Sequence, residues 1–341
     1  MSDLTYTVVR CHGLRSRLIS TSLMKMMART TDLKAFTETL LKTDYSGVVS
    51  EVPWKNIRGF TLEHIFVKKL VERCFFVSRI SPSTSIHFLQ SYCRRFEVQN
   101  IMLILRSKVM MTPRGEIEKR LFPIEQYSSV NFNALLNSNS VNEAIELLAE
   151  TIYSPSKEAI QLYESNDSLI PLEAFFERIY AEELIKSADT LPEDKENVNS
   201  LIRTQFDIRN CISVTGGVIQ GLKPELLQSL VIPHYQKISA ANITKIIYSN
   251  DTLSLVPTVF RPYIKVVNAL LTGEEAIAYV EGLRYIHKES ENVRHIRPYS
   301  FAFILTYLIS SEIEQRNLAR IAFGKEYNVS AEKIDSNLVV N

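Results

Sequence analysis

Three short stretches of this chain share one pattern, and that pattern determines the expected fold. Residues 96–104 read Phe-Glu-Val-Gln-Asn-Ile-Met-Leu-Ile, residues 206–214 read Phe-Asp-Ile-Arg-Asn-Cys-Ile-Ser-Val, and residues 313–321 read Ile-Glu-Gln-Arg-Asn-Leu-Ala-Arg-Ile. Each has an apolar residue, an acid, two variable positions, an asparagine, and apolar residues one and four positions later. In a helix this spacing places the asparagine on the apolar stripe, with the acid one turn before it.

The acids and asparagines of the three stretches are therefore candidates for a repeated structural helix: Glu97, Asn100, Asp207, Asn210, Glu314 and Asn317. The asparagines are 110 and 107 residues apart, which is hard to attribute to chance. A buried asparagine without hydrogen-bond partners costs roughly 1–3 kcal/mol. We expect all three to be buried and bonded to a neighbouring helix or to loop backbone. We interpret the acids as helix-surface groups that brace the adjacent asparagine or bind across a domain boundary.

A second motif precedes each stretch and indicates how long the repeat is. Amphipathic runs end in Tyr-Ser at Tyr45, Tyr153 and Tyr248, which lie 55, 57 and 69 residues before the respective asparagines. A period of about 108 residues is too long for an ordinary solenoid repeat. We therefore predict an all-α protein of three helical domains with approximate three-fold symmetry. The predicted domains are residues 1–120, 121–222 and 223–341.

Composition agrees with a packed helical protein and excludes several classes. Apolar residues make up 45% of the 341 residues, and only 10 glycines and 12 prolines are present, so few turns are needed. The four cysteines form no Cys-x-x-Cys pair, which favours buried thiols in a reducing compartment. No stretch of 18 uncharged apolar residues occurs. We expect a soluble, cytoplasmic protein without a membrane span.

The net charge of +1 hides an uneven distribution. Residues 1–120 carry a net charge of +10, residues 121–235 a net charge of −10, and residues 236–341 a net charge of +1. A basic first third and an acidic middle third suggest faces with different partners. The basic third could bind nucleic acid, anionic lipid head groups or an acidic protein surface.

Motifs that would indicate catalysis are missing. No His-Glu-x-x-His, Gly-x-Ser-x-Gly or phosphate-binding loop occurs, and the run from Gly216 to Lys223 lacks the Lys-Ser/Thr end of such a loop. We interpret that run as a domain junction. The three acids of the repeated helix are assigned to three different domains, so a shared catalytic centre is not predicted. We expect no catalytic, cofactor-binding or metal site.

The repeated helices resemble a known family, the C subunits of the archaeal and bacterial A/V-type ATPases, which are homologues of the d subunit of the eukaryotic V-ATPase. The resemblance is clearest in residues 312–325, Glu-Ile-Glu-Gln-Arg-Asn-Leu-Ala-Arg-Ile-Ala-Phe-Gly-Lys. The basic end Arg106-Ser-Lys108 of the first copy also fits, and Tyr6, Arg15, Arg17 and Leu18 are similar to the family's opening motif. The second copy departs from it, because Thr215-Gly-Gly stands where a basic pair is expected.

The resemblance implies a funnel of three helical domains and a mechanical function. Such a subunit is a non-catalytic part of the central stalk of a rotary ATPase or ATP synthase, with no active site and no bound nucleotide. It lies on the cytoplasmic face of the membrane as a socket between the rotor axle and the proteolipid ring, next to other central-stalk subunits. It transmits torque for ATP synthesis or hydrogen ion transport. It has no nucleic-acid or small-molecule partner.

The basic first domain is a candidate for docking to the ring or the lipid surface. The cations that we assign to this contact are Arg94, Arg95, Arg106 and Lys108. Two other functions remain open on the sequence. One is a helical scaffold that binds protein or nucleic acid through the basic first domain. The other is a helical hydrolase or isomerase with a site between domains, which would need convergent titratable residues.

Overall fold

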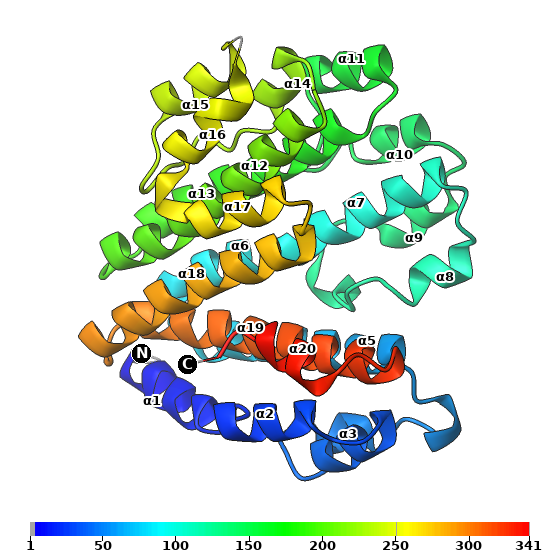
Figure 1. Ribbon diagram of the computed structural model, residues 1–341, viewed down its shortest axis with the longest axis vertical. Coiled ribbons are helices and arrows are strands. Elements are labelled where there is room, and N and C mark those ends of the chain that lie inside the picture. Colours follow the sequence, from blue (N-terminus) through cyan, green and yellow to red (C-terminus); the bar gives the residue numbers. More distant parts are fainter. Residues whose placement is uncertain (1–3, 250, 341) are drawn as a thin grey trace. The chain divides into compact units, whose positions relative to one another are not determined.

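Helices are the only regular secondary structure in the part of the chain that the structure describes. A computed structural model describes residues 4–249 and 251–340, and no β-strand occurs among them (Figure 1). The all-α prediction is therefore confirmed. The elements are α1 (Leu4–Arg15), α2 (Thr21–Ala28), α3 (Leu33–Leu40), α4 (Ser46–Val49), η1 (Trp54–Asn56), α5 (Gly59–Ile80), α6 (Ser83–Cys93), α7 (Arg95–Val109), α8 (Arg114–Glu118), η2 (Glu125–Tyr127), α9 (Phe132–Asn137), α10 (Val141–Leu147), α11 (Lys157–Asn166), α12 (Ile170–Asp189), α13 (Lys195–Ile219), α14 (Pro224–Ser229), α15 (Ala240–Ile247), α16 (Thr252–Val259), η3 (Arg261–Tyr263), α17 (Ile264–Leu271), α18 (Glu275–Ile296), α19 (Phe301–Glu326) and α20 (Ala331–Ser336).

The chain divides into two compact units. The first consists of Met1–Leu89, Pro192–Val198 and Leu283–Asn341, so it combines both ends of the sequence. The second consists of Gln90–Leu191 and Asn199–Gly282. The asparagine-containing helix α19 belongs to the first unit, whereas α7 and most of α13 belong to the second.

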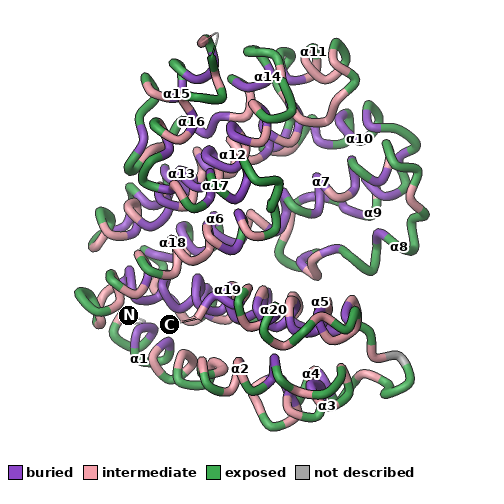
Figure 2. Tube along the Cα trace, in the orientation of Figure 1, coloured by how far each residue is buried: buried purple, intermediate pink, exposed green. Residues whose placement is uncertain are grey.

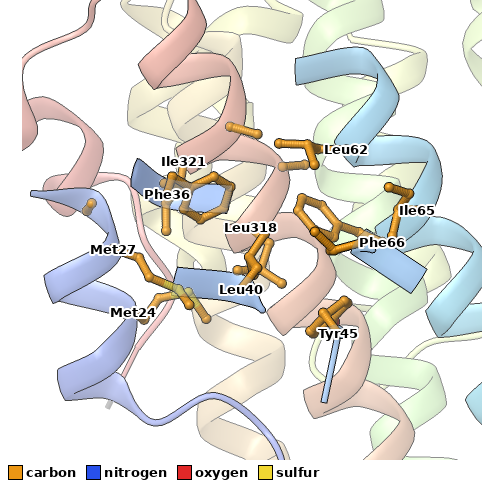
Figure 3. Packing of buried hydrophobic residues seen from close by; sticks show 14 of the residues in the cluster. Met24, Met27, Phe36, Leu40, Tyr45, Leu62, Ile65, Phe66, Leu318 and Ile321 are labelled. Atoms are coloured by element: carbon orange, nitrogen blue, oxygen red, sulfur yellow. The ribbon is translucent and has the colours of Figure 1, made fainter. Parts of the chain in front are cut away.

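Helix α19 is the centre of the first unit. It is buried on nearly every side, and it packs against α5, α1, α2 and α3. Figure 3 shows part of this core, in which Leu318 and Ile321 of α19 lie among side chains from α2, α3 and α5. An i,i+4 ion pair between Glu312 and Arg316 forms at 2.9 Å on the less buried side of the helix. Because a helix buried all round has no polar face, it depends on the surrounding helices for its stability.

Within the second unit, a long asparagine helix is followed twice by short helices. Helix α7 is followed by α8, α9 and α10, and α13 is followed by α14, α15 and α16. Helix α12 then packs against α7, α11 and α14. Figure 2 shows that exposed residues gather in the connections and on the outer sides of the short helices. The short helices therefore cover the long ones and supply part of their buried environment.

All three asparagine helices end with the same backbone geometry. The amide of Thr112 donates to Ser107 O at 3.0 Å, that of Leu222 to Gly217 O at 2.9 Å, and that of Val329 to Gly324 O at 2.8 Å. The residue before each donor has a positive φ: 51° at Met111, 68° at Gly221 and 53° at Asn328. Glycine and asparagine suit this left-handed cap, but methionine does not. The run that begins at Gly216 is thus the last turn of α13 and its cap.

We predict that Met111→Gly stabilises the protein, because it removes the contact between Cβ and backbone that disfavours the left-handed conformation. The expected gain is about 0.5–1 kcal/mol in the free energy of unfolding, after the larger chain entropy of glycine is subtracted. Urea unfolding followed by circular dichroism measures it. Met110→Gly is the control, because Met110 is also exposed but has a φ of −83°. An equal or larger gain at Met110 would contradict the explanation.

Candidate functional site

The three asparagines make the same pair of hydrogen bonds. Each side-chain amide donates to the carbonyl of the residue 22 positions later and accepts from the backbone amide of that same residue. Asn100 bonds Phe122 at 3.0 and 2.8 Å, Asn210 bonds Ile232 at 2.9 and 2.8 Å, and Asn317 bonds Val339 at 2.8 and 3.0 Å. The exposed fractions of the asparagines are 0%, 0% and 2%. The expected burial and backbone bonding are confirmed.

These bonds fasten the segment that follows each asparagine helix back onto that helix. Phe122 lies after α8, Ile232 after α14 and Val339 after α20, so each partner residue comes just after one short helix. A backbone amide and carbonyl buried at such a place must be paired, because leaving either without a partner costs roughly 1–3 kcal/mol. The carboxamide is the side chain with both a donor and an acceptor in the geometry needed.

The acids one turn earlier bind tyrosine hydroxyls. Tyr153 donates to Glu97 at 2.5 Å, and Tyr263 donates to Asp207 at 3.0 Å. Both tyrosines lie 56 residues after their acid. The third acid, Glu314, accepts at 2.8 Å from Tyr45, which lies near the other end of the chain. The third network is therefore completed by the start of the sequence.

The acids differ from our expectation in two ways. They are buried, so they are not helix-surface groups, and they do not brace the adjacent asparagines. Each binds a tyrosine of a different predicted domain, which agrees with our other interpretation, a bond across a domain boundary. Tyr248, which we grouped with Tyr45 and Tyr153 because of its Tyr-Ser motif, is 65% exposed. Its place is taken by Tyr263. The signal that could have identified Tyr263 is the constant downstream spacing of 56 residues, which the Tyr-Ser motif does not use.

The groups that compensate each buried carboxylate differ among the networks. Glu314 accepts from the amide of Ile19 at 2.5 Å and forms an ion pair of 2.7 Å with Arg73 of α5. Arg73 also binds Asp44 at 3.1 Å. Asp207 accepts instead from two backbone amides, those of Gln236 at 3.1 Å and Lys237 at 2.6 Å. Sequence reasoning missed Arg73, because no motif in the surrounding sequence distinguishes it from the other cations.

The electrostatics follow from these partners. Burial opposes the charge on Arg73, but Tyr45 and Glu314 outweigh it and raise the pKa of Arg73 above its usual value. Burial and the charge of Glu314 also raise the pKa of the Tyr45 hydroxyl. Burial raises the pKa of Asp207, although the amides of Lys237 and Gln236 act in the opposite direction. The Glu314 network is therefore a fixed arrangement of a charged pair and a neutral phenol, suited to holding helices together.

The four cations that we assigned to docking all make contacts within the second unit. Arg94 lies 3.6 Å from Glu183, and Arg106 forms a two-bond ion pair with Glu173 at 2.6 and 2.8 Å. Arg95 lies over the rings of Tyr92 and Phe96 at 4.4 and 4.8 Å. Lys108 donates to the carbonyls of Leu136 and Ser138 at 2.7 and 2.5 Å, and burial lowers its pKa. Arg94 and Arg106 retain partly exposed side chains.

Metal-binding and membrane-spanning features are absent from the described part of the chain. No group of three or more His, Cys, Asp or Glu side chains there could hold a metal ion. Within the same residues no helix is both long enough and apolar enough to cross a membrane. The cysteines Cys11, Cys74, Cys93 and Cys211 are all buried, and burial raises the pKa of the Cys11 thiol to about 12.

Comparison with known proteins identifies the family. The model of the ATP synthase (C/AC39) subunit family matches residues 7–337. The chain belongs to this family. Its curated relatives include the A-type ATP synthase C subunit of Pyrococcus horikoshii, 24% identical over 97% of this chain and 88% of the relative. The C subunits of Methanosarcina mazei and Methanocaldococcus jannaschii are 23% and 20% identical, over 99% of this chain and 93% and 87% of their own lengths.

Two of the motifs that suggested the family have structural roles. Arg15 of the opening motif donates to Glu291 of α18 and to Ser310 of α19, both at 2.6 Å. It therefore joins the first helix to two helices near the end of the chain. Residues 312–325 form the second half of α19, which carries both Glu314 and Asn317. These family motifs thus coincide with the contacts that connect the two ends of the sequence.

We predict that Asn317→Leu lowers the free energy of unfolding by about 2–3 kcal/mol. The substitution keeps the branching of the side chain but leaves the amide and carbonyl of Val339 without their partner. Chemical denaturation of the full chain measures the change. Asn292→Leu is the control, because Asn292 is an exposed residue of α18 and should change stability by less than about 0.5 kcal/mol. Equal effects at the two positions would refute the assigned role.

We predict that Arg73→Met destabilises the protein by about 3–5 kcal/mol, because it leaves the buried Glu314 without its cation. Adding Glu314→Gln to that variant should recover much of the loss. Lys69→Met is the matched control: Lys69 binds Asp44 at 3.2 Å from the same helix but is more exposed, so its expected cost is below about 1 kcal/mol. A double variant that is no more stable than Arg73→Met would sink the explanation.

Proposed function

We propose that this chain is a non-catalytic central-stalk subunit of a rotary A/V-type ATPase or ATP synthase. It forms a socket between the rotor axle and the membrane proteolipid ring, and it transmits torque for ATP synthesis or hydrogen ion transport. The observation that carries the proposal is the match of the ATP synthase (C/AC39) subunit family to residues 7–337. The C subunits of A-type ATP synthases that align over 97–99% of the chain support it.

We further propose the funnel of three pseudo-three-fold related helical domains that the sequence suggested. The three asparagines make the same hydrogen bonds, each to the residue 22 positions later. This supports three copies of one helical arrangement. The tyrosine contacts support counting each copy from its asparagine helix, with the last copy completed by the first residues of the chain. Such closure ties the two chain ends together, which suits a part that must rotate without deforming.

A torque-transmitting part has to be stiff, and two features of this chain support that role. Its asparagine and acid networks fix loops and helices at buried points, where little rearrangement is possible. Its long helices are accompanied by shorter ones that cover them. We propose that the protein acts on the cytoplasmic side of the membrane, as a peripheral subunit beside the other central-stalk subunits, without nucleic-acid or small-molecule partners.

Docking through the basic part of the chain is also a proposal. Arg94 and Arg106 are its best candidates, because their side chains are partly exposed although each is paired within the chain. Arg95 and Lys108 are held more closely by rings and carbonyl oxygens, so replacing them would disturb packing as well. Attraction of partly exposed cations to an acidic partner acts over distance and weakens with salt.

The proposed function predicts what happens when the chain is deleted from the organism that carries it. The rotor axle should no longer co-purify with the proteolipid ring, and ATP-driven ion transport should be lost while the detached head still hydrolyses ATP. Restoring the wild-type chain should restore both. An axle that remains on the ring at unchanged yield would refute the socket.

The deletion strain, when it is supplied with variants of the chain, also tests the docking cations. Arg94→Gln with Arg106→Gln should weaken co-purification with the membrane sector at low salt. Glu183→Gln with Glu173→Gln is the matched control, because it removes the same intrachain pairs and keeps the cations. Equal loss in both double variants would show that the pairs matter for the fold rather than for docking.

A further inference from the structure

One surface of the first unit combines exposed apolar side chains with cations. It is formed where α1 meets the connection between α18 and α19, and Figure 1 shows these segments side by side near the amino terminus. We call it the α1 surface. Its members are Tyr6, Val9, Arg10, Ile296, Arg297 and Tyr299.

The α1 surface is held in shape by contacts beneath it. The ring of His12 stacks on Phe303 with centroids 3.8 Å apart and lies 5.9 Å from the Tyr299 ring. Its Nε2 donates to the carbonyl of Pro298 at 2.7 Å. Arg15, one turn further along α1, binds Glu291 of α18 at 2.6 Å. The helix and the connection are therefore fixed to one another, so the surface is preformed.

The apolar members are strongly exposed for their type. The exposed fractions are 53% for Tyr6, 61% for Val9, 73% for Ile296 and 83% for Tyr299. Leaving such side chains in water forgoes about 25 cal/mol for each Å² that could be buried. Their gathering from two separate segments indicates a surface that is covered in use.

The charge of the surroundings is positive on both segments. Residues 4–31 and residues 292–311 contain no aspartate or glutamate. Two acids contact this region, and both are already bound: Glu291 pairs with Arg15 and Arg294, and Asp194 accepts from the backbone amide of Ala302 at 2.8 Å. Arg10 and Arg297 are both exposed, and Arg10 lies 5.7 Å from the Phe76 ring rather than beside an acid. A partner of this surface should therefore carry negative charge.

We propose that the α1 surface binds anionic phospholipid head groups, with Tyr6, Val9, Ile296 and Tyr299 entering the shallow interfacial layer of the bilayer. Tyrosine, aliphatic and arginine side chains in one surface are the composition that this layer favours. Specific protein interfaces place an apolar centre inside a charged rim. On the α1 surface apolar and charged side chains alternate, as in Ile296-Arg297-Pro298-Tyr299. A bilayer can bind such a mixed surface because it does not require a complementary shape.

The inference uses the proposed function only to place the chain beside a membrane. Binding to lipid is a property of the isolated chain, so it can be measured without the rotary complex. The full chain is incubated with vesicles of phosphatidylglycerol and phosphatidylcholine in equal parts, or of phosphatidylcholine alone. Sedimentation then gives the fraction bound at low and at high salt.

The wild-type chain should bind the anionic vesicles and not the neutral ones. Arg10→Gln with Arg297→Gln should lower the partition coefficient by about fivefold for each arginine at low salt. Ile296→Ser with Tyr299→Ser should lower binding at both salt concentrations, because insertion of apolar groups is not screened. Lys245→Gln with Lys265→Gln is the control, since it removes two exposed cations from the second unit and should leave binding unchanged. Circular dichroism of each variant verifies that it is folded.

Two outcomes would overturn the proposal. The first is no difference between the α1 surface variants and the lysine control, or no binding of the wild-type chain to anionic vesicles. The second is a wild-type chain that binds no vesicles although the α1 surface variants lose co-purification with the membrane sector, which would make the α1 surface a contact for protein instead. Loss of vesicle binding with intact co-purification would leave the proposed function standing.

Discussion

The fold depends on a two-bond contact between an asparagine side chain and the backbone of one residue. A carboxamide donates to a carbonyl and accepts from an amide, so it matches a peptide group that has no secondary-structure partner. In this chain that contact occurs three times, always over 22 residues, and always from a helix to the segment after a short helix. Each contact closes a local loop and pairs two buried polar groups, which would otherwise destabilise the core. This closed loop helps to position the helices that follow it in each copy.

The acids of the asparagine helices connect parts of the chain that are further apart in the sequence. Glu97 and Asp207 bind tyrosines 56 residues later, and Glu314 binds a tyrosine near the beginning of the chain. The third acid also has a buried cation as its partner, Arg73. A stronger connection is reasonable there, since the last helix and the segments that complete its network lie at opposite ends of the sequence. The ion pair between Arg73 and Glu314 thus connects segments that are far apart in the sequence, and it is costly to break.

These networks account for the buried acids and asparagines of the repeated helices by structural contacts. The acids, asparagines and tyrosines fix one helix against the next, and the described residues offer no metal cluster. The internal networks hold the helices together, so the outer surfaces of the copies are free to differ. This arrangement suits the mechanical function proposed above. The strongly exposed tyrosine and isoleucine side chains beside α1, together with their arginines, belong to this outer layer. They are not needed for the internal networks, which recur without them.

The sequence by itself determined the helical class, the three-fold recurrence of the asparagine helix and the burial of the asparagines, because a 3.6-residue period assigns each position to a helix side whatever its partner. It also determined the family. Only the tertiary structure decided what the asparagines bind, because their partners are backbone groups, which every residue has. It likewise decided that Tyr263 and not Tyr248 completes the second network, and that Arg73 and Tyr45 serve Glu314. Such contacts join residues far apart in the chain, and no local pattern records which of several similar side chains the folded chain brings within reach.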